Sequence, residues 1–142
     1  MKSLILQSVA IFFFLGCSKP VDNPHSSQCD GNTIVSEDLY KSAPKDHLTI
    51  SKAEIVNNCL KITFSSSGCN GDSWVVKLID SGSVAESFPV QRRLRLSLKN
   101  EEDCDAYITK SISFDLTPIQ LVEYNKIILH LDDTDYTLLY EY

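Results

Sequence analysis

The sequence has few of the residues that catalytic and metal sites commonly use. It contains only three histidines, and none of its five cysteines belongs to a C-x-x-C pair. Structural zinc sites are built on such close pairs, so a zinc domain is not expected. His25, His47 and His130 stand apart from any nucleophile motif, since the segment Ser65-Ser66-Ser67-Gly68 lacks the glycine pattern of a nucleophile elbow. We therefore expect neither enzyme activity nor a cofactor or metal.

Basic charge and long apolar segments are also scarce. The formal net charge of −6 repels phosphate backbones, so no nucleic-acid partner is expected. The longest apolar run, residues 4–15, would reach roughly 18 Å as a helix, against roughly 30 Å for the core of a bilayer. It is too short for a membrane span, and no later segment is long enough to be a candidate.

The first residues have the order of an export signal. Lys2 supplies the positive charge, the apolar run follows, and Gly16 is the small residue before a cut. Together with Cys17 the segment resembles the lipobox of bacterial lipoproteins, although Phe14 stands where leucine is usual. The resemblance implies a signal peptide over 1–16 and lipid on Cys17. It implies a protein held on a membrane by this lipid, in the cell envelope, at the periplasmic or surface face of the outer membrane. An ordinary signal peptide with an incidental cysteine is the alternative.

Four cysteines remain if Cys17 carries lipid: Cys29, Cys59, Cys69 and Cys104. An even number in an exported chain indicates two disulfides, for which three pairings are possible. Cys69 and Cys104 each lie in a loop before a predicted strand, and such loops can meet at one end of a sandwich. We favour Cys69–Cys104, which leaves Cys29–Cys59.

The rest of the chain divides into a polar tether, residues 17–32, and one domain, residues 33–142. Residues 34–40 could form a short strand or a helical turn. From residue 46 onward apolar residues alternate with polar ones, as in half-buried strands. The alternation slips between Ile50 and Ala53, which indicates a bulge, and residues 80–83 are predicted to form a turn. About seven short strands predict an all-β fold, an antiparallel β-sandwich, with a small β-barrel as the alternative.

The strand order and Trp74 on the third long strand resemble an immunoglobulin-like domain, although the cysteines depart from the antibody pattern. The lipobox, the tether and the small all-β domain together resemble uncharacterised lipoproteins of Bacteroidota. Neither resemblance implies an activity.

Several surface groups are candidates for binding. The acidic loops at 101–105 and 132–135 could hold calcium, but we favour a solvating role for them. Arg92, Arg93 and Arg95 could form a basic patch, or could pair with the acidic loop at 101–105. The alternating tyrosines of residues 136–142 are predicted to face the core.

A non-enzymatic binding or accessory module of the envelope, with an envelope protein as its partner, is the function that fits best. The alternative is an inhibitor of a secreted hydrolase. Residues 69–72 would be the loop that such an inhibitor inserts into the active site of the hydrolase, and a disulfide at Cys69 would hold this loop rigid.

Overall fold

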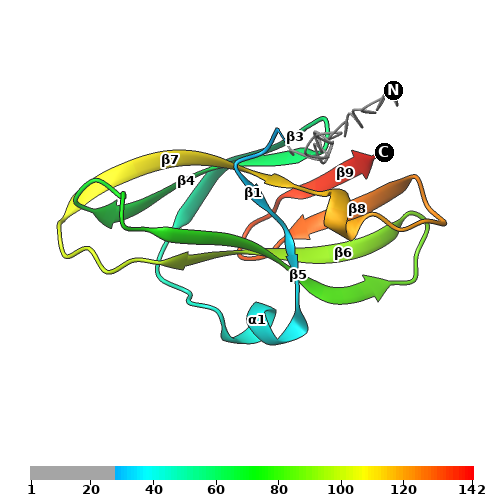
Figure 1. Cartoon of the computed structure of the whole chain (residues 1–142), viewed down its shortest axis with the longest axis horizontal. Coiled ribbons are helices and arrows are strands. Elements are labelled where there is room, and N and C mark those ends of the chain that lie inside the picture. Colours follow the sequence, from blue (N-terminus) through cyan, green and yellow to red (C-terminus); the bar gives the residue numbers. More distant parts are fainter. Residues whose placement is uncertain (1–27) are drawn as a thin grey trace, which may run out of the picture.

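The computed structural model describes residues 28–142, which form two β-sheets packed face to face (Figure 1). The signal peptide, Cys17, His25 and most of the predicted tether lie outside the described residues. The first sheet has the order β1-β7-β4-β3 and the second the order β2-β5-β6-β8-β9. The strands are β1 Gly31–Asn32, β2 Ile34–Val35, β3 Thr49–Val56, β4 Cys59–Gly68, β5 Val75–Ala85, β6 Val90–Lys99, β7 Ala106–Asp115, β8 Lys126–Leu131 and β9 Thr137–Glu141.

The helical content of the described chain is small. Helix α1 is Glu37–Ser42, and the 3-10 helix η1 is Thr117–Ile119. Residues 28–142 contain no helix long and apolar enough to cross a membrane. Neither sheet closes on itself, so the all-β sandwich predicted from the sequence is confirmed over its closed alternative.

The prediction that the sandwich is antiparallel was wrong for part of it. Parallel pairs join β1 to β7, β2 to β5 and β6 to β8. A period-two pattern shows which side chains face the core, but it does not encode the direction of the neighbouring strand. Among the long strands, β3 lies beside β4, as the first and second strands do in the immunoglobulin fold. The order differs in the other sheet, where the third long strand, β5, lies beside β6 and not beside the sixth, β8.

The domain starts before residue 33, the first residue that the sequence assigned to it. The carboxylate of Asp30 accepts a hydrogen bond from the main-chain N–H of Ser113 at 2.8 Å, and its own N–H donates to the Ser113 hydroxyl at 3.1 Å. Gly31 then pairs with Phe114 in β7. The segment has the polar composition of a loop because main-chain pairing and hydrogen bonds with β7, and not its own apolar side chains, attach it to the sheet.

The apolar side chains that alternate with polar ones along the strands meet between the two sheets and form the core. Tyr140 is fully buried, and Tyr136 and Tyr142 pack half-buried against the core, which confirms that the tyrosines face inward. Each fully buried side chain of this size contributes roughly 1.5–3 kcal/mol. The other large buried members are Leu60, Ile62, Phe64, Leu78, Leu94, Leu96, Phe114, Leu116, Ile119, Ile127, Leu129 and Leu131.

The predicted bulge in β3 is present. The pairing of β3 with β4 shifts its register between Ile50 and Lys52. The extra residue moves Ala53 back to the buried side of the strand, as the slip in the sequence pattern requires.

Residues 80–83 do not form the turn that their Asp, Ser and Gly predict. They lie inside β5, where the register to β6 shifts between Asp80 and Val84, and the chain reverses at residues 86–89 instead. Asp80 and Arg92 are both buried, and Arg92 Nε and Nη2 donate to the carboxylate at 2.9 and 2.6 Å. A buried carboxylate needs such a partner, so this tertiary pairing overrides the local preference for a turn.

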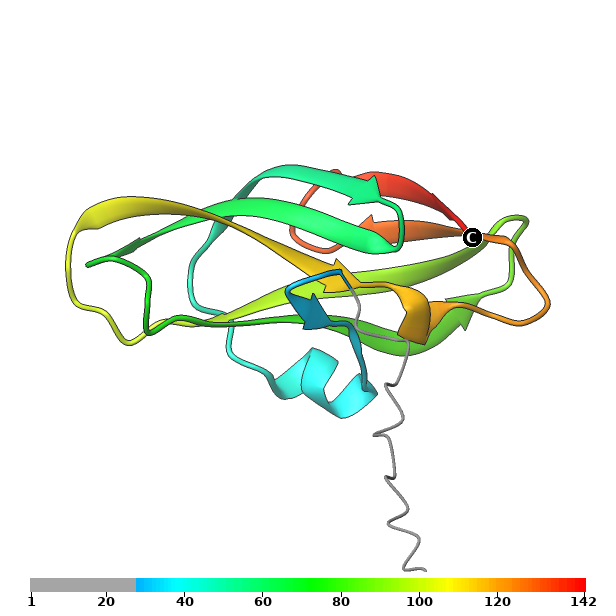
Figure 2. The same cartoon turned by 45° about the horizontal axis from the view of Figure 1, so that its top comes forward.

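Helix α1 packs on the outer side of the second sheet, against β5 (Figure 2). Ser36 caps it, since its hydroxyl accepts from the N–H of Leu39 at 3.2 Å, and Glu37 favours the first turn. Residues 34–40, left open between strand and helix, supply both β2 and the start of α1. Ile79 of β5 is fully buried although it does not belong to the core between the sheets, so it lies on the side of β5 that α1 contacts.

The basic patch predicted as one possibility does not form. Arg92 pairs with Asp80 inside the fold, and Arg93 pairs with Asp132 at 3.1 Å. Arg95 is buried, and its guanidinium donates to carbonyl oxygens in and after α1. The arginines do pair with other groups, but none of these groups belongs to the acidic loop at 101–105, the other possibility that the sequence offered.

Candidate functional site

Both disulfides join the pairs favoured from the sequence. Cys29 is bonded to Cys59, and Cys69 is bonded to Cys104. The second bond joins the loop of residues 69–73 to the loop of residues 100–105, and both lie at one end of the sandwich (Figure 1). We call these two loops the cross-linked end.

A single carboxylate organises the loop of residues 69–73. Glu102 Oε2 accepts from the main-chain N–H groups of Cys69, Asn70 and Gly71 at 2.6, 3.2 and 3.0 Å. Its other oxygen accepts from the hydroxyl of Ser73 at 2.8 Å. Successive N–H groups around one anion form a nest, so the loop is fixed by hydrogen bonds to nearly every residue.

The ionisation of Glu102 follows from this cradle. Desolvation alone would raise the pKa of its carboxyl, but the hydrogen bonds from Gly71, Ser73, Cys69 and Asn70 outweigh it and lower the pKa to about 2. Glu102 is therefore fully charged at neutral pH.

The other side of the loop is held by Lys110. Its ammonium donates to the carbonyl of Gly71 at 2.7 Å and to Asp72 at 3.1 Å, and it lies 5.8 Å from the centre of the Trp74 ring. A Cβ on Gly71, whose φ is +70°, would lie 2.8 Å from Lys110. The left-handed backbone favours glycine at this position, and a larger residue would also have to displace the end of the Lys110 side chain.

The sequence identified this loop but not the residues that hold it. Lys110 was not singled out, and Glu102 was placed in an acidic loop with a solvating role. The available signal was the position of Glu102 two residues before Cys104, because a Cys69–Cys104 bond brings that carboxylate to the loop.

Exposed apolar side chains lie at the starts of two strands at this end of the sandwich. Tyr107 is 64% exposed on β7, opposite Ser67 of β4, and Val75 is exposed at the start of β5. Exposed tyrosines are common anchors of protein interfaces. The cross-linked end thus presents a fixed polar loop, and Tyr107 is exposed on the outward face of the adjoining strand β7.

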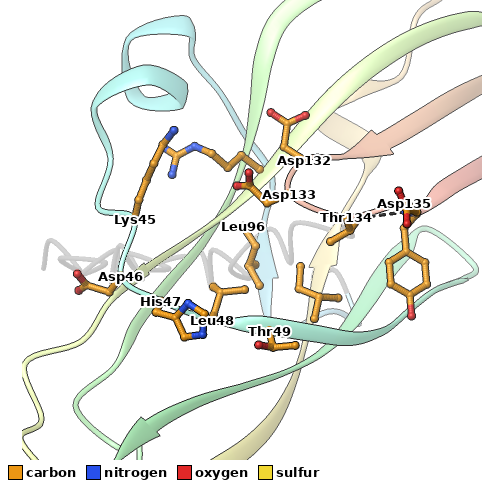
Figure 3. A pocket seen from close by; sticks show the side chains of 13 residues that line it. Lys45, Asp46, His47, Leu48, Thr49, Leu96, Asp132, Asp133, Thr134 and Asp135 are labelled. Atoms are coloured by element: carbon orange, nitrogen blue, oxygen red, sulfur yellow. Dashed lines mark hydrogen bonds between the residues drawn. The ribbon is translucent and has the colours of Figure 1, made fainter.

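A groove of about 690 Å³ forms a second candidate site, between the start of β3 and the β8–β9 turn (Figure 3). Leu48, Leu96 and Tyr136 line it with apolar groups, and Asp133 and Asp135 come from the turn. Within residues 28–142 no group of three or more His, Cys, Asp or Glu side chains is placed to hold a metal ion.

Asp132 beside the groove is held by its own neighbours. It accepts hydrogen bonds from the Tyr40 hydroxyl and, at 3.1 Å, from Arg93. Burial, and then the Asp132 carboxylate, raise the pKa of the Tyr40 hydroxyl, which therefore stays protonated as a donor. These bonds tie the β8–β9 turn to α1.

The described histidines do not form a catalytic pair. His130 Nε2 lies 2.6 Å from Gln91 Oε1, and its Nδ1 lies 3.3 Å from the Thr137 hydroxyl. His47 lines the groove. In the described part of the chain neither histidine is hydrogen-bonded to a carboxylate that would orient it as a base.

Two solved structures share this fold. A protein of unknown function (DUF1344) from Bacteroides vulgatus has a TM-score of 0.55 and 15% identity, over 79% of this chain and 56% of its own. A NigD-like immunity protein from Bacteroides caccae has a TM-score of 0.55 and 10% identity, over 77% of this chain and 57% of its own. No family model matches the sequence, and no curated protein matches it either.

These likenesses show the fold, and both structures are of Bacteroides proteins. This chain spans less than three fifths of the length of either structure.

Proposed function

We propose that this chain is a lipid-anchored accessory protein of the bacterial cell envelope, that it is not an enzyme, and that its cross-linked end binds another protein. The observation that carries the proposal is the fixed loop of residues 69–73. The Cys69–Cys104 bond, Glu102 and Lys110 all hold it. A loop fixed before binding loses little conformational entropy when a partner docks.

The location rests on different support. The two disulfides fit an oxidising compartment such as the bacterial envelope. The lipobox-like residues at Gly16 and Cys17 supply the anchor. Fatty-acid labelling tests it: the wild-type protein takes up label, and Cys17→Ser takes up none. Label retained by Cys17→Ser would rule out the anchor.

An inhibitor of a secreted hydrolase is the second candidate, and the same rigid loop favours it. Such inhibitors place a rigid loop in an active site, and Asn70, Asp72 and Ser73 are exposed in this loop beside the bridged Cys69. The structural neighbour from Bacteroides caccae is named an immunity protein, which fits a role in binding and blocking another protein.

Affinity capture from envelope extract tests both candidates. Wild-type protein and two variants serve as baits: Tyr107→Arg at the start of β7, at the cross-linked end, and Leu139→Arg on β9 as a control of similar exposure. We expect one partner to be retained by wild type and by Leu139→Arg and lost with Tyr107→Arg. A hydrolase inhibited at one-to-one stoichiometry supports the inhibitor, and a transport or assembly protein supports the accessory module. A partner kept by both variants would place the contact elsewhere.

A further inference from the structure

The end of the sandwich opposite the cross-linked end carries exposed apolar side chains on two loops. Strands β6 and β8 are parallel, with Val90 beside Ile127, so the loops that lead into them, residues 86–89 and 120–125, lie at the same end (Figure 1). Phe88 in the first loop is 85% exposed, and Val122 in the second is fully exposed. Tyr124 is exposed beside Val122. We call Phe88, Val122 and Tyr124 the apolar tip.

The chemistry of this tip is that of a membrane interface. Single exposed apolar residues are ordinary, but here two aromatic rings and a valine occupy adjoining loops. The ammonium of Lys126 lies 5.4 Å from the centre of the Phe88 ring. Aromatic rings next to a lysine suit the headgroup region, where rings enter the interface and the lysine keeps its charge in water.

The path of the chain brings this end toward the anchored segment. The described residues begin beside the last part of β7, where Asp30 bonds Ser113 and Gly31 pairs with Phe114. Strand β7 runs through η1 directly into the loop of residues 120–125. Gln28 follows Cys17 by 11 residues, a chain that reaches about 40 Å at most. A lipid on Cys17 thus keeps the tip within reach of the bilayer.

We propose that the apolar tip inserts into the headgroup region of the membrane that carries the Cys17 lipid, so that the cross-linked end faces away from that membrane. This inference rests on the lipid anchor of the proposed function. Because the tether holds the domain at a high effective concentration near the surface, a weak contact is enough to orient it. Glu86 and Glu123 flank the tip along with Lys126, so a zwitterionic surface fits better than an anionic one.

Brominated phosphatidylcholine vesicles carrying the lipidated protein test the orientation directly. The single tryptophan, Trp74, lies at the cross-linked end, next to Lys110. We expect the bromine to leave Trp74 fluorescence unchanged and to quench by half or more the tryptophan introduced by Phe88→Trp in a Trp74→Phe background. If that background does not fold, Phe88→Trp with Trp74 retained gives the same signal by difference. Quenching of Trp74 alone, or of neither position, would overturn the proposal.

The unlipidated Cys17→Ser mature chain separates the tip from the anchor. We expect it to bind phosphatidylcholine vesicles weakly in a flotation assay. Phe88→Asp/Val122→Asp should lower the partition coefficient about tenfold or more, because less apolar surface leaves water. Val75→Asp/Tyr107→Asp adds the same charge at the other end and should leave it unchanged. Replacing half of the lipid by phosphatidylglycerol should weaken binding.

Three outcomes of this second experiment count against the tip. These are no vesicle binding, equal loss in both double variants, and a dimer seen by sedimentation that Phe88→Asp/Val122→Asp dissolves. The last would make the tip an interface between two copies. If the wild-type protein takes up no fatty acid, the anchor fails, while the Cys17→Ser vesicle result still decides the membrane affinity of the tip.

Discussion

The two ends of the sandwich hold their loops by different means. At the cross-linked end the loop of residues 69–73 is itself fixed, by a disulfide and by Glu102. At the other end the Cys29–Cys59 bond joins the start of β4 to the segment before β1, and the exposed loops are supported from below. The buried Asp80–Arg92 pair lies beneath residues 86–89, and Tyr140 bonds Gln120 at the start of residues 120–125. The first end therefore presents a preformed surface, and the second presents apolar side chains on firmly held strands.

The largest effect is expected where the apolar end has its buried support. Arg92→Met leaves the Asp80 carboxylate buried without a partner, which should lower the free energy of unfolding by about 3–5 kcal/mol. Urea denaturation at neutral pH with the disulfides intact measures it. The double variant Asp80→Asn/Arg92→Met should be less destabilised than Arg92→Met, since no charge is left alone. A loss below about 1 kcal/mol for Arg92→Met would mean that water reaches the pair.

The cross-linked end should depend on its covalent bond to a similar degree. Cys69→Ala/Cys104→Ala opens a bond between residues 35 apart in the sequence, and the chain-entropy model gives a loss of about 3–4 kcal/mol. Hydrogen exchange distinguishes the two ends. The N–H groups of residues 69–73 should exchange faster in this variant, while those of residues 86–89 should not change. Faster exchange at both ends would mean that the ends are coupled.

A smaller effect is expected for the hydroxyl beneath the second apolar loop. Tyr140 Oη accepts from Gln120 Nε2 at 2.6 Å and donates to Asn58 Oδ1 at 2.9 Å. Tyr140→Phe keeps the buried ring and should cost about 1 kcal/mol in urea denaturation. Leu139→Ala, an exposed neighbour on β9, is the control. Equal changes in the two variants would contradict a specific role of the hydroxyl.

The remaining effect is a pH dependence of stability that appears only in acid. The pKa of Glu102 is about 2 in the folded chain and about 4.3 in an unfolded one. As the pH falls, the unfolded chain therefore takes up the proton first. The stability that Glu102 supplies is complete above about pH 5 and is lost as the pH falls to about 2. The Tm, measured at several pH values, should fall less steeply with decreasing pH in this window for Glu102→Gln than for wild type or Glu101→Gln. Identical slopes in all three would contradict the anion role of Glu102.

The sequence predicted those features that local pattern controls. Alternation placed Leu60, Ile62 and Phe64 in the core, the slip after Ile50 marked the bulge, and loop positions favoured Cys69–Cys104. It failed where a distant partner changes a local preference. Residues 80–83 have turn composition, but the pairing of Asp80 with Arg92 keeps them inside a strand. Glu102 lies in a segment with the acidic composition of a solvated loop, but main-chain N–H groups of the distant Cys69 and Asn70 surround its carboxylate.

By itself, the sequence determined that the domain is an all-β sandwich with an inward row on each strand, because alternation and burial are read along a single chain. It also contains the lipobox-like segment at Cys17, which stays a prediction. Only the tertiary structure decided strand direction, the roles of Glu102 and Arg92, and the placing of a rigid polar loop and an apolar tip at opposite ends. Those depend on which segments meet in space, and a single sequence does not carry that information locally.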